Sequence, residues 1–421
     1  MSAPSGTADH DQGTGAEFRR NWAALVACTV GLGLGVGALP FYTNGLFVPE
    51  LEAEFGWSRT QLSSLQLVGS LALIVTAPVV GALVDRIGVR IPATISLVVL
   101  ALAYFLLSAS GPVFVLYLVV WASMYLFASG STVVSFTRTV NEKFDRGRGL
   151  ALGIALAGTG LVAFLVPMLL GAQIAEDWRG AYRILGIAVL IGAVLVLLML
   201  PRHSAGTGRA ATAVVAPRQP VLELLRTGLF LRLTLAFMAI SLAVGGLTVH
   251  LVPMLRDAGV APTSAAAIAG AVGVSVVVGR IVVGILIDRF FAPRVAVLVL
   301  GLAAAGYVLL LVGGAPLALA AAIGVGFALG AEVDLMGYLT ARYYGLERYG
   351  RVFGVLYAVF VLGVGASPLL MSWQRDLTGG YTVPLIVSVV LLGVGAAFML
   401  ALPRFPVAAP APAPATEAAG S

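Results

Sequence analysis

Long apolar stretches, separated by short polar breaks, run through almost the whole chain. A transmembrane helix needs about 20 apolar residues, and twelve stretches approach or exceed that length. We predict spans at 22–48, 61–84, 91–110, 112–137, 149–172, 181–200, 229–255, 264–287, 293–312, 315–341, 350–371 and 380–402. The first span is long and lacks a small-residue cleavage site, so we do not expect a cleaved signal peptide. The pattern predicts an all-α integral membrane protein with twelve transmembrane helices.

The composition agrees with a membrane protein and excludes several soluble classes. Hydrophobic residues make up 60% of the 421 residues and charged residues only 10%, whereas soluble domains carry about 25% charged residues. A single cysteine, Cys28, cannot form a disulfide framework or a cysteine-rich metal site. The sequence contains no Walker motif, catalytic triad, haem motif or metal-ligand cluster. We therefore expect no enzymatic activity, no cofactor and no metal.

The basic residues are distributed unevenly between the loops. If the N-terminus is cytoplasmic, 19 of the 25 Lys and Arg residues lie in cytoplasmic segments. The positive-inside rule then places both termini in the cytoplasm. Topology thus explains the net charge of +6, and no soluble segment is long enough to form a basic nucleic-acid-binding face. We expect a monomeric, multi-pass protein of the cell (inner) membrane with no nucleic-acid partner.

The two halves of the chain repeat each other. Residues 47–51 correspond to 251–255, and residues 81–86 to 284–289, at offsets of 204 and 203. Such repeats are typical of transporters built from two bundles of the same orientation. We predict a cytoplasmic N-terminal tail, a six-helix bundle, a cytoplasmic linker, a second six-helix bundle and a disordered cytoplasmic tail, at 1–20, 21–200, 201–228, 229–403 and 404–421.

The loop between the second and third predicted spans carries a recognisable motif. It reads Gly81-x-x-x-Asp85-Arg86-x-Gly88-x-Arg90, and a degenerate second copy lies at 284–294. The sequence, position and repetition of this motif resemble the signature loop of the major facilitator superfamily. The resemblance implies the major facilitator fold and transport by alternating access.

Other segments resemble the monocarboxylate porter and oxalate/formate antiporter group of that superfamily. They are Phe55-Gly56-Trp57-Ser58-Arg59, the stretch 148–159, and Arg280 in span eight. Two features of animal monocarboxylate porters are missing. Asn21-Trp22-Ala23-Ala24 stands in place of an acidic-Gly-Gly motif, and Val276 in place of an acid one helical turn before Arg280. The resemblance implies a small carboxylate substrate.

Three ionisable residues lie inside predicted spans, where no loop explains them. A charge near the bilayer centre is costly, so such a residue is a functional-site hypothesis and needs a partner. Arg280 in span eight and Glu332 and Asp334 in span ten lie about 12–15 Å from the cytoplasmic ends of their helices. The guanidinium of Arg280 is suited to bind the carboxylate of an anionic substrate. The alternative is a permanent salt bridge from Arg280 to Glu332 or Asp334.

The two acids of span ten cannot both face one cavity. At a spacing of two residues, Glu332 and Asp334 point about 200° apart around a helix. We expect one of them to face Arg280 and to bind a proton when the anion occupies the arginine. Glu332 could instead be a fixed structural partner that carries no proton. His250, near the outer end of span seven, either assists proton uptake or packs at an interface.

Polar and aromatic residues in several spans are candidates for the wall of a substrate pocket. They are Tyr42, Asn44, Trp121, Tyr125 and Tyr357. Packing within the protein or against lipid is the alternative for each.

Charged residues at the cytoplasmic helix ends are candidates for a gate. In the first half they are Asp85, Arg86 and Arg138, and in the second half Asp288, Arg289 and Arg342. We predict charged pairs that hold this side closed when the site faces outward. Ordinary positive-inside charges are the alternative. At the outer end of span seven, Arg256 and Asp257 are expected to make surface or gate contacts.

These features predict a secondary active transporter of small organic anions. Proton-coupled symport of a lactate-like or pyruvate-like monocarboxylate by alternating access is the first hypothesis. Its partners would be the carboxylate, protons and the lipid bilayer. Alternatives are organic anion exchange, as in oxalate/formate antiport, export of a larger amphipathic compound, and a transporter-like sensor.

Overall fold

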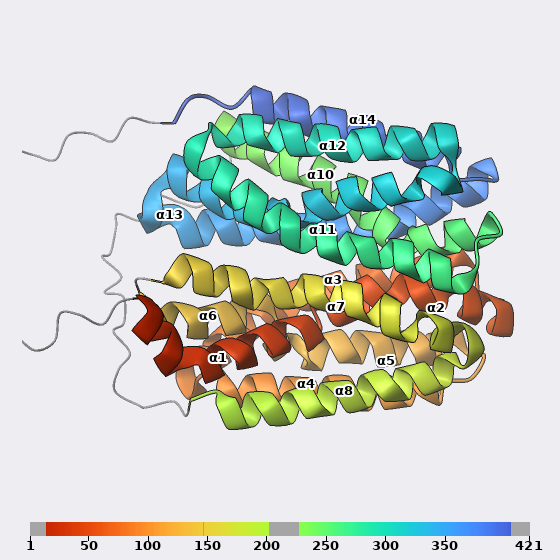
Figure 1. Cartoon of the computed structure of the whole chain (residues 1–421), viewed down its shortest axis with the longest axis horizontal. Helices are drawn as coiled ribbons and strands as arrows, with labels where there is room; N and C mark the ends of the chain where they lie inside the picture. Colours follow the sequence, from red (N-terminus) through yellow and green to blue (C-terminus); the bar gives the residue numbers. More distant parts are fainter. Residues whose placement is uncertain (1–13, 146, 202–226, 406–421) are drawn as a thin grey trace, which may run out of the picture.

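Two helical bundles lie side by side along the length of the molecule (Figure 1). The structure is a computed structural model that describes residues 14–145, 147–201 and 227–405. The first bundle contains α1 (Thr14–Leu34), α2 (Leu39–Phe55), α3 (Arg59–Ile87), α4 (Arg90–Ser108), α5 (Phe114–Phe127), α6 (Val133–Lys143), α7 (Arg148–Glu176) and α8 (Trp178–Met199). The second contains α10 (Gly228–Asp257), α11 (Pro262–Arg289), α12 (Ala292–Gly313), α13 (Ala318–Thr378) and α14 (Thr382–Leu400).

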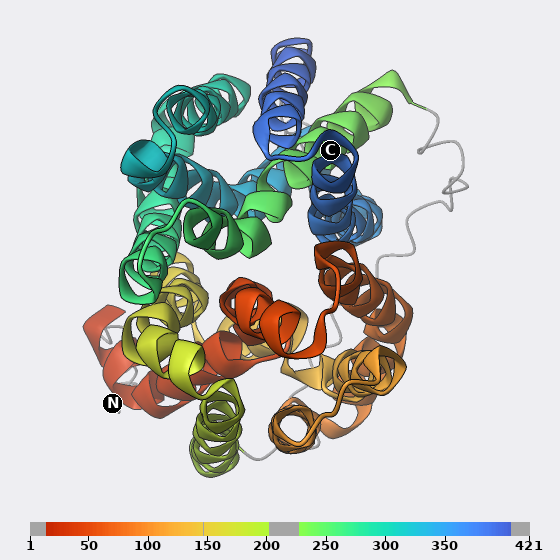
Figure 2. The same ribbon diagram turned by 90° about the vertical axis from the view of Figure 1, so that its right-hand side faces the viewer.

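The two ends of the molecule are called here the terminal side and the opposite side. The terminal side, on the left of Figure 1, holds the start of α1 and the end of α14. The opposite side holds the end of α2 and the end of α10. Figure 2 looks onto the opposite side, so that both bundles are seen roughly end-on.

The predicted all-α membrane architecture is confirmed. Eleven helices in the described residues are long and apolar enough to cross a membrane, and α5 is a shorter apolar helix. No strand occurs in the described ranges. Helix α1 begins at Thr14, inside the predicted N-terminal tail. Most of the predicted linker (202–226) and the C-terminal tail from 406 lie outside the described residues.

Predicted spans one and four are not single helices. Span one breaks between α1 and α2, and span four breaks at the short 3₁₀ turn η1 (Ser129–Ser131) between α5 and α6. The two breaks face each other, because the Ser131 hydroxyl accepts a hydrogen bond from the backbone N–H of Val36 at 3.2 Å. Irregular backbone is tolerated at membrane depth only where the protein supplies such partners.

The predicted break between spans ten and eleven lies at Gly345. The backbone stays helical on both sides of Gly345, and α13 runs from Ala318 to Thr378 with one sharp kink at that glycine. Gly345 has a φ of 71°, a left-handed conformation that glycine adopts without a Cβ penalty. The kink reverses the chain, so α13 supplies two antiparallel limbs, 318–345 and 348–378.

Small residues bring the two bundles together. Helix α7 packs on α11, α3 on α13 and α2 on α10. Gly160 and Gly273 lie against each other where α7 meets α11, and Gly365 of α13 lies against Ser70 of α3. Gly45 of α2 approaches the backbone of α10. Close approach through small residues is typical of helix packing in membranes.

A second glycine contact, the α11–α13 seam, lies inside the C-terminal bundle. Gly326 of α13 packs on the backbone of Val272, and Gly330 packs on Val276, one turn further along both helices. Residues four apart share a helix face. The next pair in this register is therefore Asp334 with Arg280.

The seam can be tested with two alanine substitutions on α13. A Cβ at Gly330 would collide with the backbone of Val276, whereas a Cβ at Gly354 would meet no atom within 4 Å. We expect Gly330→Ala to lower the free energy of unfolding by about 1–3 kcal/mol through overpacking. Gly354→Ala should change it little. Thermal unfolding of the purified protein measures both, and equal effects would contradict a role for the seam.

Candidate functional site

A cavity of about 1910 Å³ lies between the bundles and opens at the terminal side. At the terminal side, the cavity wall includes Arg90, Lys143 and Asp288, each of which lies at the end of a helix. Its deeper wall includes Arg280, Asp334 and Tyr357. Of the predicted pocket and coupling residues, these three line the cavity.

Arg280 and Asp334 form an ion pair deep in the cavity. The distance from Arg280 Nε to Asp334 Oδ2 is 3.4 Å, and the two side chains are 12% and 28% exposed. Neither Nε nor Nη1 of Arg280 makes a hydrogen bond with any described residue. The pair therefore neutralises the charge of the arginine, but two of its buried donor nitrogens stay without a hydrogen bond.

Glu332 lies on another side of α13 from Asp334. Its side chain is buried, and both carboxyl oxygens lack a hydrogen-bond partner among the described residues. Tyr42 and Tyr307 lie close enough for electrostatic interaction with it. Asp334, and not Glu332, is thus the acid that meets Arg280. The α11–α13 seam is the reason, because its register continues to residue 334.

Four predicted pocket residues do not line this cavity. Trp121 and Tyr125 are buried in the first bundle, with ring centroids 5.8 Å apart. Tyr125 packs on Gly69 of α3, which leaves no space for a side chain between them. Tyr42 is half-buried and Asn44 buried on α2, and Asn44 makes no side-chain hydrogen bond with the described residues.

The predicted gate residues lie at the terminal side, where the cavity is open. Asp85 of α3 and Arg138 of α6 form an ion pair, and both belong to the first bundle. Arg342 lies over the ring of Phe405 at 4.8 Å. Arg86, Asp288 and Arg289 are exposed. No described ion pair joins these six residues across the two bundles.

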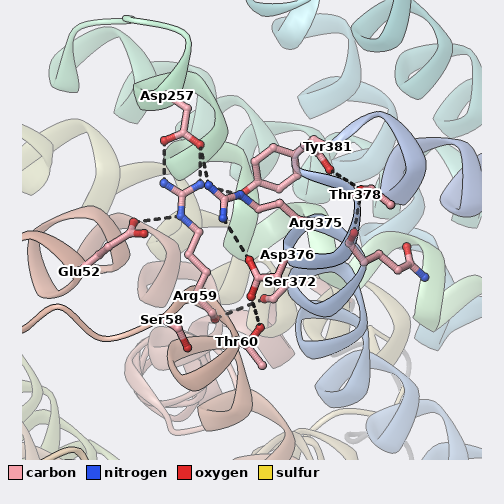
Figure 3. Close-up of polar contacts among 12 residues, drawn as sticks. Glu52, Ser58, Arg59, Thr60, Asp257, Ser372, Arg375, Asp376, Thr378 and Tyr381 are labelled. Atoms are coloured by element: carbon pink, nitrogen blue, oxygen red, sulfur yellow. Dashed lines mark hydrogen bonds and ion pairs between the residues drawn. The ribbon is translucent and has the colours of Figure 1, made fainter.

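The opposite side is closed by an ionic cluster that joins the two bundles (Figure 3). Arg59 of α3 donates from both terminal nitrogens to Asp257 of α10 at 2.6 Å, and its Nε donates to Glu52 at 2.9 Å. It also donates to the Tyr381 hydroxyl at 2.9 Å. Arg375 lies 3.6 Å from Asp257. These five residues are called the Arg59 cluster.

The local sequence fixes the position of Arg59. Helix α2 ends at Gly56, whose φ of 67° reverses the chain. Ser58 then caps α3: its hydroxyl accepts from the N–H of Gln61, and the Gln61 side chain accepts from the N–H of Ser58. This capping box starts α3 at Arg59, whose side chain is only 5% exposed.

His250 belongs to the closed opposite side. Its Nε2 lies 3.0 Å from the carbonyl of Pro368, which can only accept, and its Nδ1 lies 3.1 Å from the Tyr381 hydroxyl. A neutral ring with its proton on Nε2 satisfies both contacts. Tyr381 in turn accepts from Arg59. The histidine is thus connected to the Arg59 cluster and does not line the cavity.

From the sequence, Arg59 was noted only as part of the Phe55–Arg59 segment that resembles the monocarboxylate porter group, and Glu52 had no predicted contact. Asp257 was expected to make surface or gate contacts, and it does bridge the two bundles. A signal was present in the sequence, because a capping box placed Arg59 in the first turn of a helix. The partner on α10, 198 residues away, could not be read from spacing.

A cavity between two helical bundles, open on one side and closed by ion pairs on the other, is the arrangement of an alternating-access transporter. The family comparison agrees with this class. The sequence model of the Major Facilitator Superfamily matches the chain over residues 25–333 and again over 251–420. The chain belongs to the major facilitator superfamily, as the motif at Gly81–Arg90 predicted, and is a multi-pass membrane transporter.

Relatives with similar sequences support this assignment. Monocarboxylate transporter 13 of Bos taurus is 29% identical over 395 residues, which cover 91% of this chain and 89% of the relative. Monocarboxylate transporter 11 of Homo sapiens is 29% identical, with 91% and 83% covered. The agnestins efflux protein AgnL12 of Paecilomyces divaricatus is 23% identical, with 89% and 83% covered.

The similar solved structure supports the fold alone. It is a bacterial homologue of the human lysosomal transporter Spinster, described as inward-facing and occupied, with a TM-score of 0.69. The two chains are 15% identical, and the match covers 92% of this chain and 97% of the other.

The Arg59 cluster can be tested by comparing two arginines of the opposite side. Arg59 joins the bundles, whereas Arg179 pairs with Glu54 inside the first bundle at 2.6 Å. We expect Arg59→Gln to shift the closed-to-open equilibrium of this side about tenfold, equivalent to about 1.4 kcal/mol. Arg179→Gln should leave it unchanged.

Spin labels measure this opening. The exposed residues Ala53 and Ala258, at the ends of α2 and α10, would carry the labels after the native Cys28 is replaced by alanine. Arg59→Gln should add a population with a longer distance between the labels. Identical distance distributions in the two arginine variants would show that the Arg59 cluster does not hold this side closed.

Proposed function

We propose that this protein is a secondary active transporter of small organic anions that carries a monocarboxylate together with a proton. One observation carries the proposal: Arg280 lies deep in the cavity with two donor nitrogens that make no hydrogen bond among the described residues. A guanidinium binds a carboxylate through parallel N–H donors. Relatives of this chain that are monocarboxylate transporters support the same substrate class.

In the proposed cycle, Asp334 is the proton switch. Asp334 neutralises Arg280 while the site is empty. When a carboxylate binds Arg280, it competes with Asp334 for the same donors. A carboxylate that loses its counter-charge inside a membrane is costly, so Asp334 takes a proton as the anion binds. One proton then moves with one anion, and the ion pair forms again after release.

Glu332 has a different place in the cycle. Its oxygens have no partner in the described chain, and an unpaired charge in such surroundings costs far more than a neutral carboxylic acid. Glu332 therefore stays protonated through the cycle as a neutral packing group. The alternative that Glu332 is the proton carrier is an outcome of the experiment below.

Alternating access in this proposal depends on charged contacts at the two sides. We take the terminal side as cytoplasmic, so the structure represents the inward-open form with the Arg59 cluster closed. When the cavity opens outward, the cluster separates and the cytoplasmic gate residues meet. These are Asp85, Arg86, Arg138, Asp288, Arg289 and Arg342.

His250 would be exposed in the outward-open form. Its contact with Tyr381 is broken when the Arg59 cluster separates, and the ring is then free to accept a proton from the outer solution. Tyr42 and Asn44, in the first half of α2, are proposed to contact the substrate in that form. Trp121 and Tyr125 are proposed to pack behind the residues that line the cavity.

The proposed membrane topology follows from the distribution of charge along the chain. We place the protein in the cell (inner) membrane as a monomer, with both termini in the cytoplasm. Its partners are the carboxylate substrate, protons and lipid.

Export of a larger amphipathic compound is the second candidate. The cavity volume of about 1910 Å³ greatly exceeds that of a three-carbon acid, and one relative is an efflux protein. Transport measured in both directions with the same substrate distinguishes the two candidates.

The role of Arg280 predicts a complete loss of carboxylate transport in Arg280→Gln. Proteoliposomes loaded with unlabelled lactate, pyruvate or a larger acid would be tested for exchange with the labelled form. Arg183→Gln, at an exposed arginine of α8 outside the cavity and the gate, is the control and should retain transport. Normal exchange in Arg280→Gln would contradict the assignment of the anion site.

The proton switch predicts different behaviour for the two amide variants of span ten. In Asp334→Asn, exchange of anions should continue, but an inward proton gradient should no longer drive accumulation. In Glu332→Gln, accumulation should stay dependent on the gradient. The opposite pattern would show that Glu332 carries the proton. Uptake by the unmodified protein that does not depend on the proton gradient would exclude symport.

A further inference from the structure

A column of aromatic rings lies on the second limb of α13. Tyr349, Phe353 and Tyr357 occur on successive turns, with ring centroids 5.2 and 5.7 Å apart and interplanar angles of 11° and 13°. Phe360 extends the column at 6.2 Å from Tyr357. The first three rings line the cavity, whereas Phe360 is buried. Tyr349, Phe353 and Tyr357 are called the aromatic column.

The aromatic column lies beside the ion pair. Asp334 and Gly337 both line the cavity from one face of the first limb of α13. A Cβ placed on Gly337 would lie 3.1 Å from the hydroxyl oxygen of Tyr349 and 3.8 Å from Cε2 of Phe353. The aromatic column therefore packs one helical turn from Asp334, which itself contacts Arg280.

The deeper part of the facing wall, which the first bundle contributes, is apolar. It includes Val133 of α6 and Leu152 and Leu156 of α7. Deep in the cavity, a ligand therefore meets one guanidinium, one carboxylate, the aromatic column and aliphatic side chains. A lactate-sized acid would use only the guanidinium and would leave the aromatic wall without contact.

The geometry of the rings favours a particular partner. The three rings are nearly parallel, and all three line the cavity. Ring edges are electropositive and ring faces electronegative, so edges attract the face of another aromatic ring. The same edges do not repel a nearby carboxylate.

We propose that the preferred substrate is a monocarboxylate that carries an aromatic ring. Arg280 binds its carboxylate, and the face of its ring lies across the edges of the aromatic column. This inference rests on the proposed function, because it assumes that Arg280 binds the anion. It adds the chemical class of the remainder of the substrate.

Three acids with the same 2-hydroxy acid head test the proposal: lactate, 3-phenyllactate and 3-cyclohexyllactate. They would be compared as labelled substrates in proteoliposomes, with protein-free liposomes to subtract passive entry of each acid. We expect kcat/KM for phenyllactate to exceed that for lactate about tenfold or more. It should also exceed that for cyclohexyllactate about threefold to tenfold, because only the aromatic ring gains the edge-to-face contact.

Variants of the aromatic column test whether these rings cause the preference for phenyllactate. Phe353→Leu should reduce the preference for phenyllactate over cyclohexyllactate about threefold to tenfold and leave lactate transport unchanged. Phe353→Tyr keeps a ring and should retain the preference. Phe127→Leu, at a ring that is 67% exposed on the lipid-facing surface, is the matched control and should have no effect.

The outcomes separate this inference from the proposed function. If all three acids are transported equally in an Arg280-dependent way, the aromatic substrate class is wrong and the anion site stands. If Phe353→Leu slows all three acids alike, the aromatic column serves conformational closure and the inference is also wrong. If no acid is transported, or if Arg280→Gln transports them normally, the proposed function itself fails.

Discussion

An arginine inside a membrane needs an anionic partner, and the structure is arranged around that requirement. Arg280 obtains its partner from another helix, since the position one turn before it on α11 is Val276. Asp334 can reach it because glycines allow α11 and α13 to pack closely along the α11–α13 seam. The resulting ion pair includes no hydrogen bond from Nε or Nη1 of Arg280 to the described residues. This incomplete pairing is the basis of the proposed exchange of Asp334 for a substrate carboxylate.

The ion pairs at the two ends of the molecule are arranged differently. On the opposite side, Arg59 donates from all three nitrogens of its guanidinium to partners from both bundles. On the terminal side, the Asp85–Arg138 pair stays within one bundle, so it does not hold the cavity closed. Cross-bundle pairing at one end only matches a transporter in which one side opens at a time.

Aromatic residues show how strongly the environment decides the role of a side chain. Trp121 and Tyr125 on one bundle and Phe353 and Tyr357 on the other form similar columns at a spacing of four residues. The first pair is buried behind α3, whereas the second lines the cavity. Spacing along a helix predicts that such residues share a face, but not which face the tertiary structure turns to the cavity.

The sequence by itself determined the membrane class, the helical architecture, the repeat and the presence of unexplained charge at Arg280. Hydropathy and intramembrane charge are local properties, and bilayer thickness makes them nearly unambiguous. Only the tertiary structure decided that Asp334 meets Arg280, that Arg59 joins the two bundles and that spans ten and eleven are joined by a sharp kink at Gly345. Those outcomes depend on close contacts between distant segments, which backbone packing fixes and sequence spacing does not record.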